Sequence, residues 1–146
     1  MVEDWLYYIE VKSSVMASVA CIEDLQKLAQ RRVPKMFYDY ADSGSWSEST
    51  YYANEADLAA IKLRQRVALD VSNRSTEMSM LGKKLPMPVA LAPTGLTGMQ
   101  CADGEILAAR AAADFGVPFT LSTMSICSIE DVAANSPDPF WFQLYV

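Results

Sequence analysis

Residues Pro88 to Ser122 read PVALAPTGLTGMQCADGEILAARAAADFGVPFTLS and place a helix between two strands. Three segments make up this stretch: the apolar strand PVALA (88–92), the helix DGEILAARAAADF (103–115) and the strand PFTLS (118–122). Alanine favours the helix, Asp103 can cap its start, and Gly116 suits its end. The first strand is expected to end at the turn signal PTG, residues 93–95.

The same order continues toward the carboxyl end of the chain. SIED (128–131) opens the next helix as a capping box, and FWFQLYV (140–146) is a third strand. Strands that alternate with helices predict a parallel sheet, and strands that are apolar on both faces fit a sheet covered by helices. A doubly wound open sheet and a (β/α)₈ barrel both satisfy this α/β pattern. The first turn lacks GxGxxG, so a Rossmann site is unsupported, and the strands favour the barrel.

The residues before this sheet are predicted to be mainly helical. Helices are expected at 22–32, 35–42 and 45–63, and a hairpin at 78–87, where LGKK separates two apolar flanks. The chain is therefore divided into a tail or upstream extension at 1–21, amino-terminal helices and a hairpin at 22–85, and three strands with two helices at 86–146.

Composition excludes several classes of function. The net charge of −6 argues against a nucleic-acid partner, which would need a basic face. The 3 cysteines have no CxxC spacing, so neither a disulfide framework nor a zinc site is indicated. With 0 histidines, the chain has no imidazole base and no histidine ligand for a metal.

The amino terminus is mildly apolar. Acidic residues and Lys12 interrupt its apolar positions, and a basic leader is missing, so it is a poor signal peptide and too interrupted to cross a bilayer. Met16 is a candidate for the true start, which would make residues 1–15 an upstream extension.

Strand alternation assigns side chains to the two faces of the sheet. The face expected to point toward a barrel axis carries Ala90, Ala92 and Thr94 in the first strand, Thr120 and Ser122 in the second, and Trp141, Gln143 and Tyr145 in the third. Each strand thus ends with a hydroxyl or amide group at the same edge. One such group alone reads most simply as a satisfied polar residue at a strand end. Together, above an apolar floor, they suit a flat heteroaromatic ligand with ring nitrogens and carbonyls.

Four segments resemble the FMN-dependent 2-hydroxy acid dehydrogenases and oxidases, the family of respiratory L-lactate dehydrogenase, glycolate oxidase and mandelate dehydrogenase. They are PKMFYDYADSG (34–44), MPVALAPTGLTGM (87–99), PFTLSTMSICSIEDVA (118–133) and FWFQLYV (140–146). The resemblance extends from about residue 22 to the end, with the motifs in the family's order. It implies the amino-terminal part of a TIM barrel, FMN as cofactor, and oxidation of an L-2-hydroxy acid. L-Lactate is favoured because the second and third segments most resemble the bacterial lactate dehydrogenase branch of the family.

The resemblance also implies roles for individual residues. Pro93, Thr94 and Gly95 match the backbone segment that packs against the flavin ring, and Gly95 stands where an alanine is common. Ser122 and Gln143 match side chains that bind the flavin's polar edge.

Two tyrosines match residues on the substrate side of the family's site. Tyr40, which by pattern alone reads as a core residue, matches a tyrosine that binds the substrate carboxylate. Tyr145 matches a tyrosine beside the substrate hydroxyl and is the catalytic candidate, with flavin contact as well. Met124 stands where glycolate oxidase carries tryptophan, which argues against glycolate as the substrate.

The family's histidine base, the arginine that binds the substrate carboxylate, and a lysine beside the flavin have no counterpart in this chain. We therefore expect an amino-terminal fragment of a longer enzyme, inactive alone and binding FMN weakly or not at all. The resemblance implies a quinone or oxygen as electron acceptor, a homo-oligomer at full length, and a cytoplasmic location that can include the inner face of the cell membrane. The alternative is a non-catalytic truncated interaction module, whose third strand would pair with a partner chain.

Overall fold

The computed structural model describes residues 19–146, which form two compact units that meet at Ser43 and Gly44. Of the expected tail at 1–21, only residues 19–21 fall within the described part, and the candidate start at Met16 falls outside it. The predicted boundary between residues 85 and 86 lies within the second unit and stays a prediction. In the described residues, no helix combines the length and apolar character needed to cross a bilayer.

The first unit contains two helices, α2 (Ile22–Arg32) and α3 (Lys35–Ala41). Both were predicted, and α3 ends one residue earlier than expected. Helix α2 stops because Val33, which precedes Pro34, adopts an extended conformation. The Gln26 amide then donates a hydrogen bond of 2.7 Å to Asp42 and joins the two helices.

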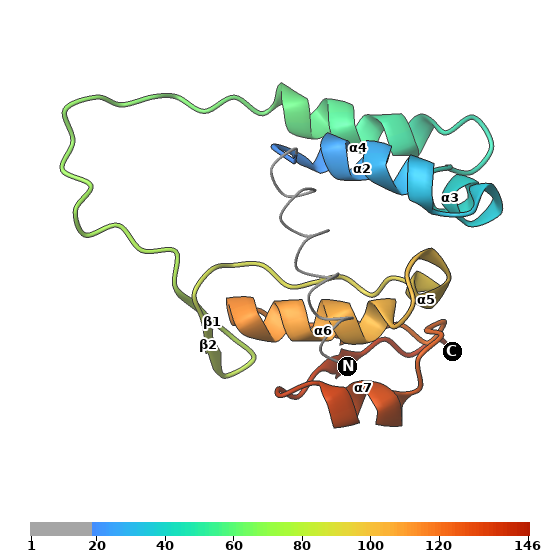
Figure 1. Ribbon diagram of the computed structural model, residues 1–146. Helices are drawn as coiled ribbons and strands as arrows, with labels where there is room; N and C mark the ends of the chain where they lie inside the picture. Colours follow the sequence, from blue (N-terminus) through green and yellow to red (C-terminus); the bar gives the residue numbers. More distant parts are fainter. Residues whose placement is uncertain (1–18) are drawn as a thin grey trace. The chain divides into compact units, whose positions relative to one another are not determined.

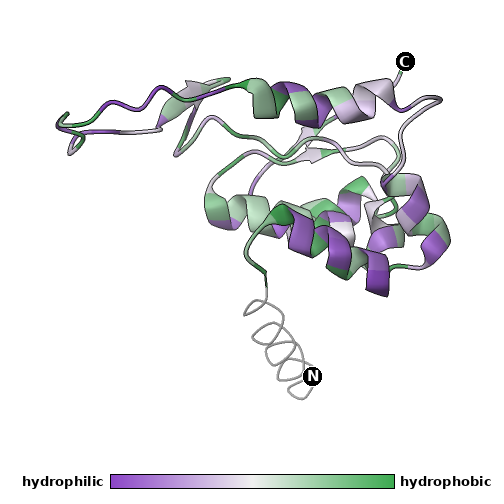
Figure 2. Cartoon of the chain, turned by 90° about the horizontal axis from the view of Figure 1, so that it is seen from above, coloured by the Kyte–Doolittle hydropathy of each residue, from purple (hydrophilic) through white to green (hydrophobic). Residues whose placement is uncertain are grey.

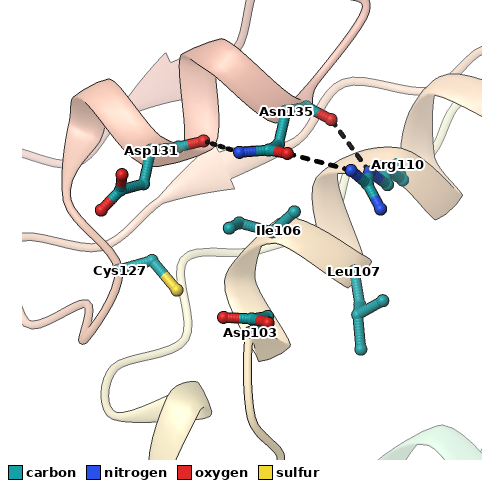
Figure 3. Close-up of a pocket in the computed structure, with 7 residues that line it drawn as sticks. All are labelled: Asp103, Ile106, Leu107, Arg110, Cys127, Asp131 and Asn135. Carbon is teal, nitrogen blue, oxygen red and sulfur yellow. Dashed lines mark hydrogen bonds between the residues drawn. The ribbon is translucent and has the colours of Figure 1, made fainter. Parts of the chain in front are cut away.

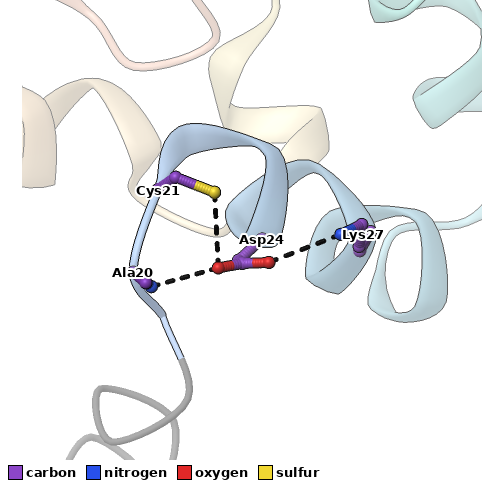
Figure 4. A network of polar contacts seen from close by, with 4 residues as sticks. All are labelled: Ala20, Cys21, Asp24 and Lys27. Atoms are coloured by element: carbon purple, nitrogen blue, oxygen red, sulfur yellow. Dashed lines mark hydrogen bonds and ion pairs between the residues drawn. The ribbon is translucent and has the colours of Figure 1, made fainter.

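Asp24 organises the start of α2 (Figure 4). Its carboxylate accepts the Ala20 backbone N–H at 3.1 Å and the Cys21 thiol at 3.4 Å, and it pairs with Lys27 at 3.5 Å. The hydrogen bond from Ala20 is the main reason why the pKa of Asp24 lies below its ordinary value. A carboxylate in the first turn also complements the positive end of the helix dipole.

Helix α4 (Ser49–Ala60) opens the second unit and is shorter than the predicted 45–63. Before it, Glu48 adopts a left-handed conformation with φ 57°, and its carboxylate accepts the Gly44 N–H at 2.9 Å. Residues 61–77 contain neither helix nor strand. Ile61, Leu63, Val67 and Leu69 are exposed there, separated mostly by charged residues.

The predicted hairpin is present as β1 (Met78–Met80) and β2 (Lys83–Leu85), paired antiparallel with Met80 opposite Lys83. Its two-residue turn has positive φ at both Leu81 (48°) and Gly82 (81°). This is the pattern of a type I′ turn, whose twist matches that of the two strands.

The α/β part follows along the chain as α5 (Thr97–Gln100), α6 (Gly104–Phe115), β3 (Thr120–Leu121), α7 (Ile129–Asn135) and β4 (Trp141–Phe142). The expected strand at 88–92 is reduced to one parallel bridge between Leu91 and Phe119. On its other side, β3 pairs parallel with β4, with Leu121 opposite Phe142. The parallel order of three neighbouring segments is thus confirmed, although each is shorter than predicted.

Helices α6 and α7 lie side by side and cover one face of β3 (Figure 1). The core consists of Ile106, Ala109, Ala112, Val117, Phe119, Leu121 and Val132. Phe140 packs against it, with its ring 6.1 Å from that of Phe119. The helices carry hydrophilic and hydrophobic residues side by side (Figure 2), as expected when only one face of each is buried.

The ends of these helices test the capping predictions. Ser128 caps α7 by accepting the Asp131 N–H at 3.0 Å, and Gly116 ends α6 with φ 72°, so both are confirmed. Asp103 is the N-cap residue of α6, as predicted, but its side chain makes no capping hydrogen bond. The reason is its left-handed backbone, φ 55°, which leaves only the Asp103 carbonyl to accept the Leu107 N–H.

Replacing Leu121, which is 0% exposed, tests whether β3 anchors the core. Leu121→Ala should lower the free energy of unfolding by about 2–5 kcal/mol, because it leaves a cavity. Leu58→Ala is the matched control, since Leu58 on α4 is 70% exposed and alanine favours a helix. Urea denaturation followed by circular dichroism measures both, and equal effects would contradict the assignment.

Candidate functional site

Ser122 and Gln143 meet at the carboxyl ends of β3 and β4. The Ser122 hydroxyl is buried, accepts the Met124 backbone N–H at 3.1 Å and donates to Oε1 of Gln143 at 3.3 Å. Because Oε1 faces the serine, the amide nitrogen of Gln143 keeps both of its donors; within residues 19–146 it makes no hydrogen bond.

The turn at 93–95 lies against the loop that follows β3. The Leu96 N–H donates to the Met124 carbonyl at 2.9 Å. A Cβ placed on Gly95 would stand 3.1 Å from the Met124 Cβ and 3.7 Å from the Ser122 hydroxyl. Gly95, Ser122 and Gln143 are therefore brought together from three neighbouring strand ends, and we call them the rim.

The other predicted site residues are placed differently. Pro93 is half-buried within the same turn. The Thr94 hydroxyl lies 3.4 Å from the Ala92 carbonyl, and Thr94 lines a cavity of about 210 Å³ together with Glu105 and Phe119. The described structure gives Thr94 no hydrogen bond to Ser122 or Gln143.

The two tyrosines also differ from the rim residues. Tyr145 lies three residues after the end of β4 and is 57% exposed, and its backbone N–H donates to the Thr123 hydroxyl at 3.3 Å. Tyr40 lies on α3 in the first unit and is 67% exposed. The substrate-binding roles of both residues stay predictions.

Two residues that sequence reasoning missed hold the rim in place. The Thr123 hydroxyl donates to the Gln143 carbonyl and accepts the Tyr145 N–H, so it fastens the end of β4 to the loop after β3. Glu105 is 2% exposed, and its Oε1 accepts the N–H groups of Gly98 at 3.1 Å and Ile126 at 3.0 Å. A glutamate beside Ile106 in the buried first turn of α6 was the available signal.

Burial alone would raise the pKa of Glu105. The backbone hydrogen bonds, foremost that from Ile126, outweigh burial and hold the pKa of this carboxyl below its ordinary value. Burial, together with the nearby Glu105 carboxylate, raises the pKa of the Cys127 thiol. Cys127 is therefore protonated at neutral pH and is a poor nucleophile.

A second hollow, of about 420 Å³, lies between α6 and α7 (Figure 3). It is lined by Asp103, Ile106, Leu107, Arg110, Cys127, Asp131 and Asn135. Arg110 is held there by the carbonyl of Asn135 at 3.0 Å and by its side-chain oxygen at 3.1 Å. None of the rim residues lines this hollow. Among the described residues, no cluster of histidine, cysteine, aspartate or glutamate is arranged to hold a metal ion.

Gly98→Ala is expected to destabilise the protein by about 1–3 kcal/mol, because overpacking forces backbone shifts. The new Cβ would stand 2.7 Å from the Ile126 Cβ and 3.2 Å from Oε2 of Glu105. Gly95→Ala is the comparison, since its nearest contact is longer, and it should cost less. Urea denaturation of both variants checks this, and a Gly98→Ala variant as stable as the parent would refute the close approach.

Glu105→Gln should cost about 1 kcal/mol of unfolding free energy at pH 7, because two charge-assisted hydrogen bonds become neutral ones. The folded-state pKa is lowered, so this contribution is complete above the ordinary value of 4.5 and is lost as pH falls through the folded pKa. The gap between parent and variant should therefore close at low pH. Denaturation curves at pH 7 and pH 3 measure it, and a gap that is constant with pH would contradict the assignment.

Comparison with known proteins gives a consistent set of relatives. The family model described as FMN-dependent dehydrogenase matches residues 29–146. The L-lactate dehydrogenase of Pectobacterium atrosepticum is 52% identical over 128 residues, which cover 88% of this chain and 33% of the relative. That of Actinobacillus pleuropneumoniae serotype 5b is 51% identical, with 88% and 34% covered.

Solved structures agree with this. A soluble mutant of the membrane-associated (S)-mandelate dehydrogenase from Pseudomonas putida has a TM-score of 0.80 and 43% identity, and the match covers 86% of this chain and 36% of that one. A monotopic membrane (S)-mandelate dehydrogenase has a TM-score of 0.83 and 41% identity, with 88% and 35% covered. The chain spans about a third of the length of the curated relatives it matches. It belongs to the FMN-dependent dehydrogenase family, as its four motifs and its α/β fold indicated.

Proposed function

We propose that this chain supplies the flavin-facing amino-terminal part of a (β/α)₈ barrel in an enzyme that oxidises an L-2-hydroxy acid to the 2-oxo acid. L-Lactate is the first substrate to test, because the two relatives compared above are L-lactate dehydrogenases. The observation that supports the proposal most is the meeting of Gly95, Ser122 and Gln143 at the ends of three parallel segments. Barrel enzymes build their active sites at this end of the strands.

The rim residues fit the chemistry of a flavin ring. The flavin's polar edge carries carbonyl oxygens and ring nitrogens, which need donors. The Gln143 amide nitrogen offers two N–H groups, and its orientation is fixed because its oxygen receives the buried Ser122 hydroxyl. The absence of a side chain at Gly95 lets the turn lie close to the loop after Ser122, where a Cβ would stand 3.1 Å from the Met124 Cβ. These are the residues of the chain that would hold FMN.

The contribution of this chain to the reaction is binding and orientation. Bound FMN supplies the acceptor for the two electrons removed from the substrate. Tyr40 and Tyr145 carry phenolic hydroxyls that can donate hydrogen bonds, so they can orient the carboxylate and hydroxyl of a substrate. The chain has 0 histidines, and the histidine base implied by the family has no counterpart in it. Alone, the chain is therefore expected to be inactive and to bind FMN weakly or not at all.

The location, electron acceptor and oligomeric state of the whole enzyme are also part of the proposal. Two of the solved (S)-mandelate dehydrogenases are described as membrane-associated and monotopic, which supports a peripheral position on the inner face of the cell membrane. A quinone would be the electron acceptor in that setting, and oxygen is the alternative for an enzyme of the cytoplasm. A homo-oligomer at full length remains part of the proposal.

A second candidate is a non-catalytic interaction module. Leu91 at one edge of the parallel segments, and Leu144 and Val146 beyond β4, are exposed apolar residues. Open strand edges with apolar side chains can pair with another chain. This reading predicts a stable, soluble 146-residue protein that binds a partner and no flavin.

A fusion protein tests the first proposal directly. Joined after Val146 to the remaining two thirds of the Pectobacterium atrosepticum relative, the chain should purify with bound FMN and oxidise L-lactate with an artificial electron acceptor. The 146-residue chain alone should do neither. A folded fusion protein without FMN would overturn the proposal, and a stable, flavin-free chain that captures a partner would favour the module.

The same fusion protein tests Gln143. Gln143→Leu should weaken FMN binding about tenfold, because a flavin oxygen or nitrogen would lose its donor in a partly buried site. Gln65→Leu is the matched control, because Gln65 is exposed and lies outside the helices and strands. Fluorescence titration with FMN measures both, and equal affinities would remove Gln143 from the site.

A further inference from the structure

Glu105 is a buried carboxylate that the proposed flavin site does not use directly. One of its oxygens, Oε1, accepts hydrogen bonds from Gly98 and Ile126, which belong to two different connecting segments, one before α6 and one after β3. Gly98 lies in α5, three residues after the turn that ends at Gly95. Ile126 lies four residues after Ser122, in the loop that follows β3. A single oxygen atom thus joins the two loops that carry the rim.

The two loops lie close together at Gly98 and at Leu96. Gly98 has no side chain, and a Cβ there would stand 2.7 Å from the Ile126 Cβ. The loops also meet where the Leu96 N–H donates to the Met124 carbonyl. Glu105 therefore adds side-chain hydrogen bonds to the contact between the two loops, which is otherwise made by the backbone hydrogen bond from Leu96 to Met124.

Core packing does not account for a glutamate at this position. Within residues 19–146, Oε2 of Glu105 is buried without a regular hydrogen bond, and the Cys127 thiol beside the carboxylate helps to lower its pKa. A buried polar atom without a partner weakens folding, so an apolar residue would pack the core at lower cost. The feature that a carboxylate provides here is the pair of charge-assisted hydrogen bonds to the two loops.

We propose that Glu105 is a positioning residue for the flavin site: it holds the turn at 93–95 against the loop after Ser122 and so fixes the direction of the Gln143 amide. This inference rests on the proposed function. Glu105 acts on Gln143 through Ser122. Ser122 stands at the start of the loop that Glu105 binds at Ile126, and its hydroxyl donates to the Gln143 side chain.

Glu130 provides the matched control, because it is the second residue of α7 as Glu105 is the second residue of α6. Glu130 is exposed, and no hydrogen bond joins it to a loop in the described structure. Substitutions at Glu105 and Glu130 therefore change the equivalent position in the first turn of two helices. Only the substitution at Glu105 removes hydrogen bonds to the two loops.

The test uses the fusion protein loaded with FMN. Glu105→Ala should raise the dissociation constant of FMN by about tenfold or more, since two charge-assisted hydrogen bonds to the loops are lost. It should also shift the visible absorbance bands of the flavin, because the polar groups at the ring edge move. Glu105→Gln keeps an oxygen acceptor and should bind FMN within about threefold of the parent. Glu130→Ala should leave affinity and spectrum unchanged.

Glu105→Asp makes the test independent of the alanine variant. Aspartate keeps the charge but is one methylene shorter, so it cannot reach both N–H groups and should still weaken FMN binding and shift the spectrum. A Glu105→Asp variant with parental affinity and spectrum would overturn the inference, as would a Glu105→Gln variant that behaves like Glu105→Ala. If the unsubstituted fusion protein fails to bind FMN, it is the proposed function that fails.

Discussion

The parallel hydrogen bonds on the two sides of β3 are the constraint on which the rest of the α/β part depends. The Leu91 N–H donates to the Pro118 carbonyl at 2.8 Å, and the Trp141 and Gln143 N–H groups donate to the carbonyls of Phe119 and Leu121, each at 2.9 Å. This register puts the carboxyl ends of three segments at one edge. It also directs Phe119 and Leu121 to the helices and leaves Thr120 and Ser122 for the opposite face. This register therefore brings the Ser122 and Gln143 side chains within hydrogen-bonding distance.

The elements with strong local signals could be predicted from the sequence. Alanine-rich α6 ends at its glycine, Ser128 caps α7, and the LGKK turn forms a hairpin, because each depends on residues a few positions apart. The lengths of the strands could not be predicted in this way. Strand pairing requires a neighbour, and within residues 19–146 the segment around Leu91 pairs with β3 through a single bridge, although its apolar run is five residues long.

The rim was predicted in part, for a related reason. Strand alternation and family motifs both point to Ser122 and Gln143, and alternation is a local property that the register preserves. Thr94 lies beyond the last paired residue of its segment, so alternation no longer governs it, and it lines the cavity beside Glu105 instead. The role of Glu105 could not be predicted, because a charged residue in a helix is usually exposed to solvent. Its role depends on loops that come together only in the folded chain.

The exposed stretch after α4 has a consequence for the behaviour of the chain in solution. Ile61, Leu63, Val67 and Leu69 have the spacing and β-branched or aliphatic character of a segment that could stack with copies of itself. Lys62, Arg64 and Arg66 are interleaved with them. These cations act as gatekeepers, because bringing two such stretches together would place like charges side by side. In this stretch, resistance to self-association therefore depends on three basic side chains that make no contribution to the core.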